Sequence, residues 1–171
     1  MEVKVVKYNP KWIDAFDKEA AELKEQIGNN LKDVHHIGST AVPNLMAKPI
    51  IDMILEVRDL KELDIQTAKL EAIGYEGLGE NGIPGRRYFR KGGYYRTHQI
   101  HAFESGDPSI TRHLAFRDYL RAHEEIAIAY GVLKSDITKR CNNDIERYCD
   151  EKDDFVKHHE AIAIQWYKNA H

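Results

Sequence analysis

One stretch of the chain, residues 49–57, is almost continuously apolar and rich in β-branched side chains, apart from a single carboxylate at Asp52. A run of this length and character predicts a strand at the centre of a sheet, buried on both faces. A carboxylate inside such a strand costs roughly several kcal/mol unless a partner or a metal ion holds it. Asp52 is therefore either an internal hydrogen-bond acceptor or part of a functional site.

A second strand is predicted for residues 32–37, and it leads into the turn Gly38-Ser39-Thr40. Glycine lets the backbone approach a ligand closely, and the backbone N–H groups at the start of a short helix after this turn form a natural phosphate cradle. The same three residue types are also common in ordinary turns. The position of the turn, just before the strand with the lone carboxylate, favours a site, and Lys48 would neutralise a polyphosphate there.

Apolar residues at helical spacing predict a helix near the N-terminus and another over residues 59–73. Residues 87–104 predict a hairpin of two strands around a glycine turn. The remaining sequence keeps a helical rhythm almost to its end. We therefore expect a single domain over residues 1–171, in which an α+β sheet part (1–105) is followed by a helical part (106–171) packed on it.

Charge is distributed unevenly along this chain of 171 residues, whose formal net charge is −3. Residues 84–103 contain no acidic side chain and five basic ones, which are Arg86, Arg87, Arg90, Lys91 and Arg96. A single local basic patch argues against a nucleic-acid partner, because such partners require a broad basic surface. It suits a small anion such as a phosphate. Arg86 and Arg87 are candidates for an anion clamp; a charged, solvated hairpin edge is the alternative.

No apolar run approaches the ~20 residues that a membrane-spanning helix needs, and the N-terminus lacks the pattern of a secretory signal. A disulfide between Cys141 and Cys149 would close a short loop inside a predicted helix, so both are expected to be reduced thiols. These features predict a cytoplasmic protein without a membrane partner.

Two histidines, His98 and His101, lie in the second strand of the predicted hairpin. They point to opposite faces of a regular strand, so both can bind one ion only if a bulge intervenes. His101 is either a metal ligand or a satisfied, half-buried histidine. Glu56, on the same face of its strand as Asp52, and Glu104, near the end of the hairpin, are the carboxylates that could join an ion held by Asp52.

Three separated blocks of sequence resemble a known family. They are HIGSTAVPNLMAKPIID from His36 to Asp52, THQIHAFE over residues 97–104 and HLAFRDYLRAH over residues 113–123. In this order they resemble the GrpB-like family, an uncharacterised group with a nucleotidyltransferase-like fold. The resemblance implies an α+β protein with a mixed sheet of the polymerase-β type, flanking helices and a C-terminal helical part.

The resemblance also implies roles for particular residues. In active nucleotidyltransferases the glycine-serine turn, here Gly38-Ser39, holds the triphosphate. An acid-x-acid pair on the next strand binds two Mg²⁺ ions together with a third carboxylate from a later strand. Asp52 stands at the first acidic position, Ile54 at the second, and Glu104 is a candidate for the third.

The leading hypothesis is Mg²⁺-dependent nucleotidyl transfer from a nucleoside triphosphate to an unknown acceptor. Its candidate catalytic residues are Asp52, Glu56 and Glu104. Its candidate phosphate-binding residues are Gly38, Ser39, Thr40, Lys48, Arg86 and Arg87. Candidate metal ligands are Asp52, Glu104, His98 and His101. Two alternatives stay open: a catalytically silent module that binds a nucleotide or a small phosphorylated anion, and a different metal-dependent chemistry that uses Asp52 with one histidine.

Overall fold

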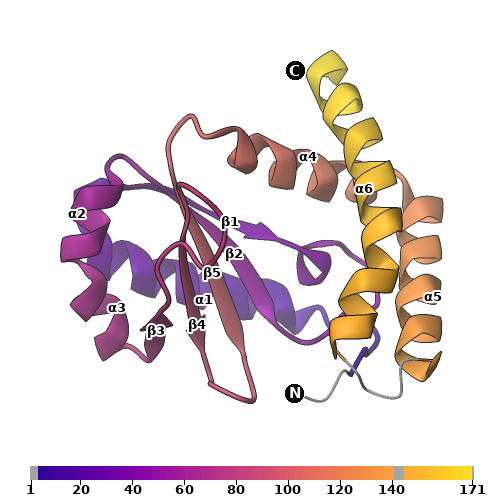
Figure 1. The fold of residues 1–171 in the computed structure, drawn as a ribbon, viewed down its shortest axis with the longest axis horizontal. Helices are drawn as coiled ribbons and strands as arrows, with labels where there is room; N and C mark the ends of the chain where they lie inside the picture. The colour runs from indigo at the N-terminus through magenta and orange to yellow at the C-terminus, as the bar shows by residue number, and fades with distance from the viewer. Residues whose placement is uncertain (1–3, 141–144, 171) are drawn as a thin grey trace.

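The computed structural model describes residues 4–140 and 145–170 (Figure 1). In this part of the chain a five-stranded sheet has the order β1-β2-β5-β4-β3. The strands are β1 Leu31–Ile37, β2 Ile51–Val57, β3 Tyr75–Gly77, β4 Arg87–Lys91 and β5 His98–Glu104. Strands β2 and β5 run parallel and the other neighbours run antiparallel, so the sheet is mixed, as the α+β prediction requires.

Helices flank the sheet and continue beyond it. They are α1 Lys11–Ile27, α2 Leu60–Ile65, α3 Thr67–Ala72, α4 Pro108–Ala122, α5 Glu124–Arg140 and α6 Ile145–Ala170, with short 3₁₀ turns η1 Gly28–Asn30 and η2 Ser39–Ala41. No helix within 4–140 or 145–170 is both long and apolar enough to cross a membrane. Cys141 and the side chain of Cys149 lie outside the described residues.

The helix predicted over residues 59–73 is divided into α2 and α3 at Gln66. The amide of this buried residue donates a hydrogen bond of 2.8 Å to the carbonyl of Ile27 and accepts one of 3.2 Å from Asn30. A polar side chain that is satisfied inside the protein fixes the backbone at this point, and apolar spacing alone does not report it.

The two faces of the sheet pack against different helices, because side chains alternate along each strand. From β2, Met53 and Leu55 point to the face that α1 covers, where they join Leu23 and Ile100 in the main core. Figure 1 shows α1 running along this face. Asp52, Ile54 and Glu56 occupy the other face by the same alternation, so the carboxylate of the central strand points away from the main core.

The C-terminal helices rest on this second face and on the connection between β1 and β2. Ile110 of α4 packs against Ile54 and Phe103 of the sheet. Leu45 in the connection packs with Tyr130 of α5 in a separate buried cluster. Phe155 of α6 packs on the same cluster. These contacts hold α4, α5 and α6 beside the connection between β1 and β2, which places side chains distant in sequence around one cavity.

Candidate functional site

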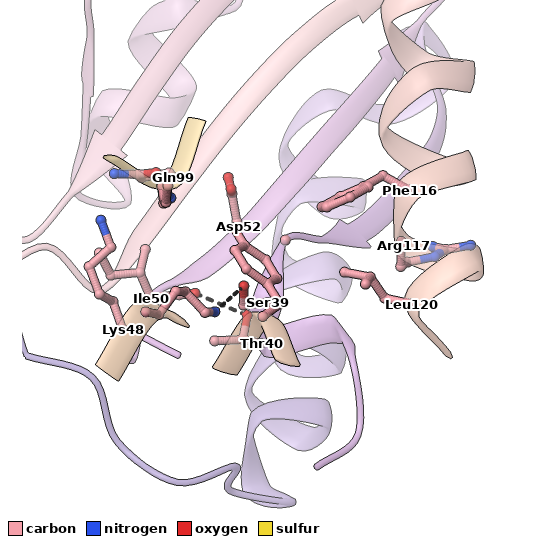
Figure 2. A pocket seen from close by; sticks show the side chains of 13 residues that line it. Ser39, Thr40, Lys48, Ile50, Asp52, Gln99, Phe116, Arg117 and Leu120 are labelled. Atoms are coloured by element: carbon pink, nitrogen blue, oxygen red, sulfur yellow. Dashed lines mark hydrogen bonds between the residues drawn. The ribbon is translucent and has the colours of Figure 1, made fainter. Parts of the chain in front are cut away.

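A cavity of about 190 Å³ lies where the turn after β1, the start of β2 and the C-terminal helices meet (Figure 2). It is lined by Gly38, Ser39, Thr40, Lys48, Ile50, Asp52, Gln99, Phe116, Arg117, Leu120, Tyr130, Lys134 and Lys152. Among these described residues four side chains are cationic and only one is acidic. The charge of the cavity therefore suits an anion.

Gly38 brings the turn against Asp52. Its backbone has φ 72° and ψ −171°, a region that only glycine occupies readily. A Cβ atom at this position would lie 3.1 Å from Oδ2 of Asp52 and 3.2 Å from its Cβ. Glycine is therefore required twice here, for its backbone conformation and for the space that the carboxylate fills.

Thr40 has a structural role in the turn. Its hydroxyl donates to the carbonyl of Ile50 at 3.0 Å and, with its hydrogen used, accepts from Nε2 of His36 at 3.0 Å. His36 is buried and stacks on Phe16 with a centroid distance of 4.7 Å. Burial is the main cause, and the positive charge of the nearby Arg121 the second, that lower the pKa of His36 to about 4. This agrees with a neutral ring that donates from Nε2. Thr40 thus connects His36 of β1 to Ile50, which lies just before β2, through two hydrogen bonds.

Ser39 points into the cavity and meets a residue that sequence analysis did not single out. Nζ of Lys134, from α5, donates to Oγ of Ser39 at 2.6 Å and lies 4.5 Å from the ring centroid of Tyr130. Lys134 is only 2% exposed. A serine and a buried lysine at this distance form a preorganised pair of donors for an anion.

The environment of Lys134 disfavours its charge. Burial, followed by repulsion from Lys152 and Lys48, lowers the pKa of Lys134 well below its ordinary value. Among the side chains that the structure describes, no carboxylate pairs with Lys134. Lysine is rarely buried so deeply without a counter-ion. A bound anion would supply that counter-charge.

One signal in the sequence could have revealed this lysine. Position 134 falls on the apolar stripe of α5, four residues after Tyr130 and three before Ile137, both of which are buried. A lysine on the buried face of an amphipathic helix is unexpected for packing alone.

Asp52 is held by a relay of hydrogen bonds rather than by a second carboxylate. Its Oδ1 accepts from Nε2 of His101 at 2.8 Å, and Nδ1 of His101 accepts from the guanidinium of Arg86 at 3.2 Å. Because arginine only donates, the imidazole proton must lie on Nε2. Burial on its own would raise the pKa of Asp52, but His101, with His113 and Lys152, lowers it below the ordinary value. Asp52 is therefore an ionised acceptor, as the internal-acceptor interpretation requires.

Arg86 supports the relay from outside the cavity. It is buried, donates to the carbonyls of Glu80 and Asn81 at 3.2 and 2.9 Å, and lies 5.0 Å from the ring centroid of Tyr88. Arg87, by contrast, pairs with Asp64 of α2 at 2.7 Å. The structure does not bring the two arginines together as a clamp, and neither lines the cavity.

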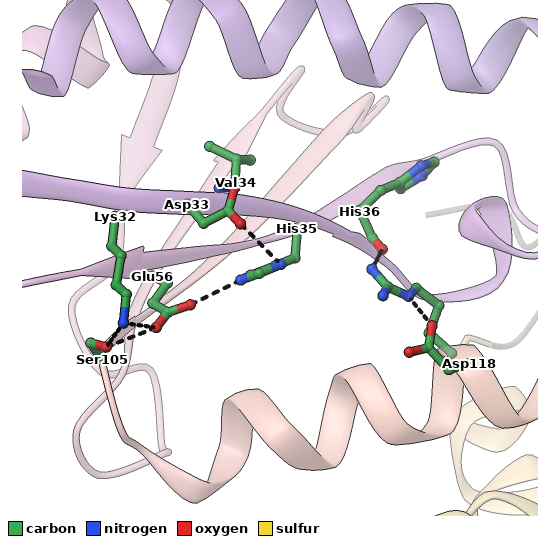
Figure 3. A network of polar contacts seen from close by, with 9 residues as sticks. Lys32, Asp33, Val34, His35, His36, Glu56, Ser105 and Asp118 are labelled. Atoms are coloured by element: carbon green, nitrogen blue, oxygen red, sulfur yellow. Dashed lines mark hydrogen bonds and ion pairs between the residues drawn. The ribbon is translucent and has the colours of Figure 1, made fainter. Parts of the chain in front are cut away.

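Glu56 lies in a different polar network (Figure 3). Its carboxylate accepts from His35 at 3.0 Å and from Ser105 at 2.8 Å, and Lys32 lies 3.6 Å away. Four positions along a strand separate it from Asp52, a distance of about 13 Å. The structure therefore places Glu56 outside the cavity, although strand alternation puts it on the same face.

Glu104 and His98 also lie elsewhere. Glu104 is exposed and aligns with Val57 at the far end of β2, whereas Gln99 is the residue that aligns with Asp52. His98 faces α1, where its Nε2 lies 3.8 Å from Glu19. Of the two histidines, only His101 contacts Asp52. Strand alternation correctly separates them.

The donor set does not match a two-metal centre. Ile54, at the second acidic position, is fully buried against Phe103 and Ile110. In the part of the chain that the structure describes, no group of three or more histidine, cysteine, aspartate or glutamate side chains is arranged to hold a metal ion. The other charged side chains that line the cavity with Asp52 are cations, which oppose a bare divalent ion.

The sheet order, the glycine-serine turn and the carboxylate on the following strand define a nucleotidyltransferase-like fold. A solved cytoplasmic RNA terminal U-transferase has this architecture, with a TM-score of 0.53 and 16% sequence identity over 75% of this chain and 40% of that one. At this level of identity the similarity establishes the fold alone.

Residues 2–161 match the family described as GrpB protein, and the chain belongs to that family. It is 48% identical over 166 residues to UPF0157 protein YqkA of Bacillus subtilis, covering 97% of this chain but 48% of YqkA, so the chain spans about half the length of that relative. It is 34% identical to glutamate-rich protein GrpB of Alkalihalophilus pseudofirmus, over 91% of this chain and 92% of that one. The crystal structure of GrpB from Enterococcus faecalis has a TM-score of 0.92 and 44% identity, covering 96% of this chain and 99% of that one.

Proposed function

We propose that this protein binds a nucleotide or another small phosphorylated molecule, with the phosphates in the cavity beside Ser39. The observation that carries the proposal is the convergence of Lys48, Lys134 and Lys152 on a cavity with one carboxylate. Repulsion from Lys152 and Lys48 adds to burial in lowering the pKa of Lys134, so the charged form of this lysine is disfavoured in the cavity. Phosphate oxygens would relieve this repulsion and accept the hydrogen bonds.

The turn and α5 would both contribute hydrogen-bond donors to the phosphates. The hydroxyl of Ser39 would donate to phosphate oxygens from one side, and Lys134 from the other. Asp52 would set a boundary, because its negative charge repels phosphate and so directs it toward the lysines. This arrangement requires no metal ion for binding.

Isothermal titration with inorganic tripolyphosphate at pH 7, in buffer with a chelator, tests the proposal. The natural protein should bind, and Lys134→Met should weaken binding by about 10- to 100-fold, because charge-assisted hydrogen bonds contribute about 1.5–3 kcal/mol. Ser39→Ala should weaken binding without adding a large cavity. Lys157→Met is the matched control, since Lys157 is exposed on α6 and pairs with Asp153 at 2.8 Å.

Two results would overturn the proposal. One is the failure of the natural protein to bind tripolyphosphate. The other is equal weakening in Lys134→Met and Lys157→Met, which would indicate general charge attraction rather than a defined site.

Mg²⁺-dependent nucleotidyl transfer is a second candidate, favoured by the position of Asp52 directly against the Gly38 turn. Asp52 would then bind Mg²⁺ carried by the triphosphate, and the ion would neutralise charge on the transferred group. Asp52→Asn separates the two candidates. In the binding module it should strengthen metal-free binding of tripolyphosphate, because it removes a repulsive charge. In a transferase it should abolish any Mg²⁺-dependent gain in affinity for nucleoside triphosphates.

A further inference from the structure

A second cavity, of about 390 Å³, adjoins the first. Its lining residues are Lys4, Lys48, Pro49, Ile50, Tyr94, Tyr95, Arg96 and Thr97. Lys48 and Ile50 line both cavities, so the two spaces lie on either side of the same short segment. This volume falls within the range of roughly 300–1,000 Å³ that is usual for small-molecule pockets.

The β4–β5 turn forms one wall of this second cavity. The carbonyl of Lys91 accepts from the N–H of Thr97 at 2.9 Å, and the carbonyl of Gly92 accepts from that of Tyr95 at 3.0 Å. A Cβ atom on Gly92 would lie 2.5 Å from the carbonyl oxygen of Tyr95. The N–H of Ile51 donates to the carbonyl of Thr97 at 2.9 Å and ties the turn to the start of β2. The wall is therefore a defined turn.

Two aromatic rings at this turn face solvent. Tyr94 is 61% exposed and Tyr95 is 80% exposed, and their centroids lie 4.9 Å apart in an edge-to-face arrangement. They are the only exposed members of the tyrosine, phenylalanine and tryptophan side chains that the structure describes. Adjacent exposed rings beside a cavity form a stacking platform for a planar group.

Arg96, the next residue, supplies a second observation that points to a ligand. Its Nε is buried and has no hydrogen-bond partner within the described residues. A buried donor without an acceptor is costly, and it is rare in native structures. Because Arg96 lines the cavity, a shift of its half-buried side chain on binding would bring this donor to a carbonyl oxygen or ring nitrogen of a ligand.

We propose that the second cavity binds the base of a nucleotide whose phosphates occupy the first. The inference rests on the proposed function and narrows its ligand class from phosphorylated molecules to nucleotides. Tyr94 and Tyr95 provide the stacking surface, and Arg96 donates to an acceptor on the base. Lys48, which lines both cavities, lies where the base and the phosphates are joined.

Titration of two kinds of ligand tests this inference. The natural protein is titrated with ATP, GTP, CTP and UTP, and separately with inorganic tripolyphosphate, which has no base. At least one nucleotide should bind about tenfold more tightly than tripolyphosphate, as expected for one stacked base. Tyr95→Ala and Arg96→Met should each remove most of that advantage while leaving the affinity for tripolyphosphate unchanged.

Arg90→Met is the matched control for Arg96→Met. Arg90 lies on β4 of the same hairpin, pairs with Glu76 at 3.1 Å and does not line either cavity. Its variant should keep the full preference for nucleotides. Because Tyr95 is largely exposed, Tyr95→Ala should keep the thermal unfolding midpoint of the natural protein, which separates loss of the platform from loss of the fold.

The base site and the phosphate site can fail separately. If tripolyphosphate binds as tightly as every nucleotide, the base site is refuted and the phosphate site stands. If both hairpin variants weaken tripolyphosphate and nucleotides equally, the turn acts through charge or folding, and the base site is again refuted. If nucleotides bind through Tyr95 but tripolyphosphate does not bind, the base site stands and the phosphate site fails. If nothing binds, both are refuted.

Discussion

Nζ of Lys134 lies 2.6 Å from Oγ of Ser39, although 95 positions separate the two residues in the chain. This contact joins α5 to the turn that follows β1. It also places a buried cation at the wall of a cavity whose other charges are mostly positive. The first prediction follows from the energetic cost of that cation.

The free energy of unfolding should depend on pH through the titration of Lys134. Its folded-state pKa is lowered, so between that value and the ordinary 10.5 the unfolded state binds more protons than the folded state. Stability from this group therefore rises as the pH rises through that window. Lys134→Met removes the buried charge and should stabilise the protein most at pH 6 and progressively less toward pH 10, as measured by urea unfolding. A difference that does not vary with pH would contradict this.

Gly38→Ala should destabilise the protein by about 1–3 kcal/mol, because alanine is strained in this backbone region, and Asp52 must also move away from the new methyl group. Chemical denaturation measures the loss. Gly79→Ala is the control, since Gly79 also has a positive φ of 61° but nothing lies within 4 Å of its added Cβ. Equal losses in the two variants would show that the contact with Asp52 contributes nothing.

Acid should destabilise the protein partly through His113, a half-buried residue of α4 that stacks on His101 with a centroid distance of 5.9 Å. Burial lowers the pKa of His113 most, and charge interactions with His101 and Arg112 lower it further, from 6.5 to about 4. Between these values the unfolded state binds more protons, so stability is fully present above pH 6.5 and declines as the pH falls to about 4.

His113→Phe should therefore reduce the slope of stability against pH in that window, by up to about 1.4 kcal/mol per pH unit for one proton. Unfolding by urea at several pH values measures the slope. His158→Phe, at an exposed position on α6, is the control and should leave the slope unchanged. An unaltered slope in His113→Phe would show that this histidine is not a source of the acid sensitivity.

Glu56→Gln and Glu104→Gln should each leave the affinity for tripolyphosphate within about twofold of the natural value, because effects at distant sites are usually independent. Glu56 is held by His35 and Ser105, and Glu104 lies at the far end of the sheet. Calorimetric titration beside Lys134→Met provides the comparison. A loss of binding in either glutamine variant as large as that in Lys134→Met would mean that the site extends well beyond the cavity.

Much of the fold follows from local patterns in the sequence. The apolar run around Asp52 becomes β2, and the β-hairpin over residues 87–104 forms as predicted. Alternation along a strand correctly separates His98 from His101. These predictions succeed because period and turn chemistry depend on neighbouring residues. The division of the predicted helix at Gln66 does not follow from such patterns, because its cause is a hydrogen bond to Ile27 across the fold.

The candidate site depends on both levels of information. Local sequence patterns are enough to locate the turn at Gly38, the carboxylate of Asp52 and the face of the sheet on which that carboxylate lies. The link from Arg86 through His101 to Asp52, and the contact of Lys134 with Ser39, depend on how the elements pack together. The alternation of side chains along a strand specifies the face on which a residue lies, but not which residues of other elements lie near it. The contacts of a long side chain on a helix depend on where that helix packs. For that reason the carboxylate could be found from its own strand, whereas its partners and the cations opposite it required the packed helices.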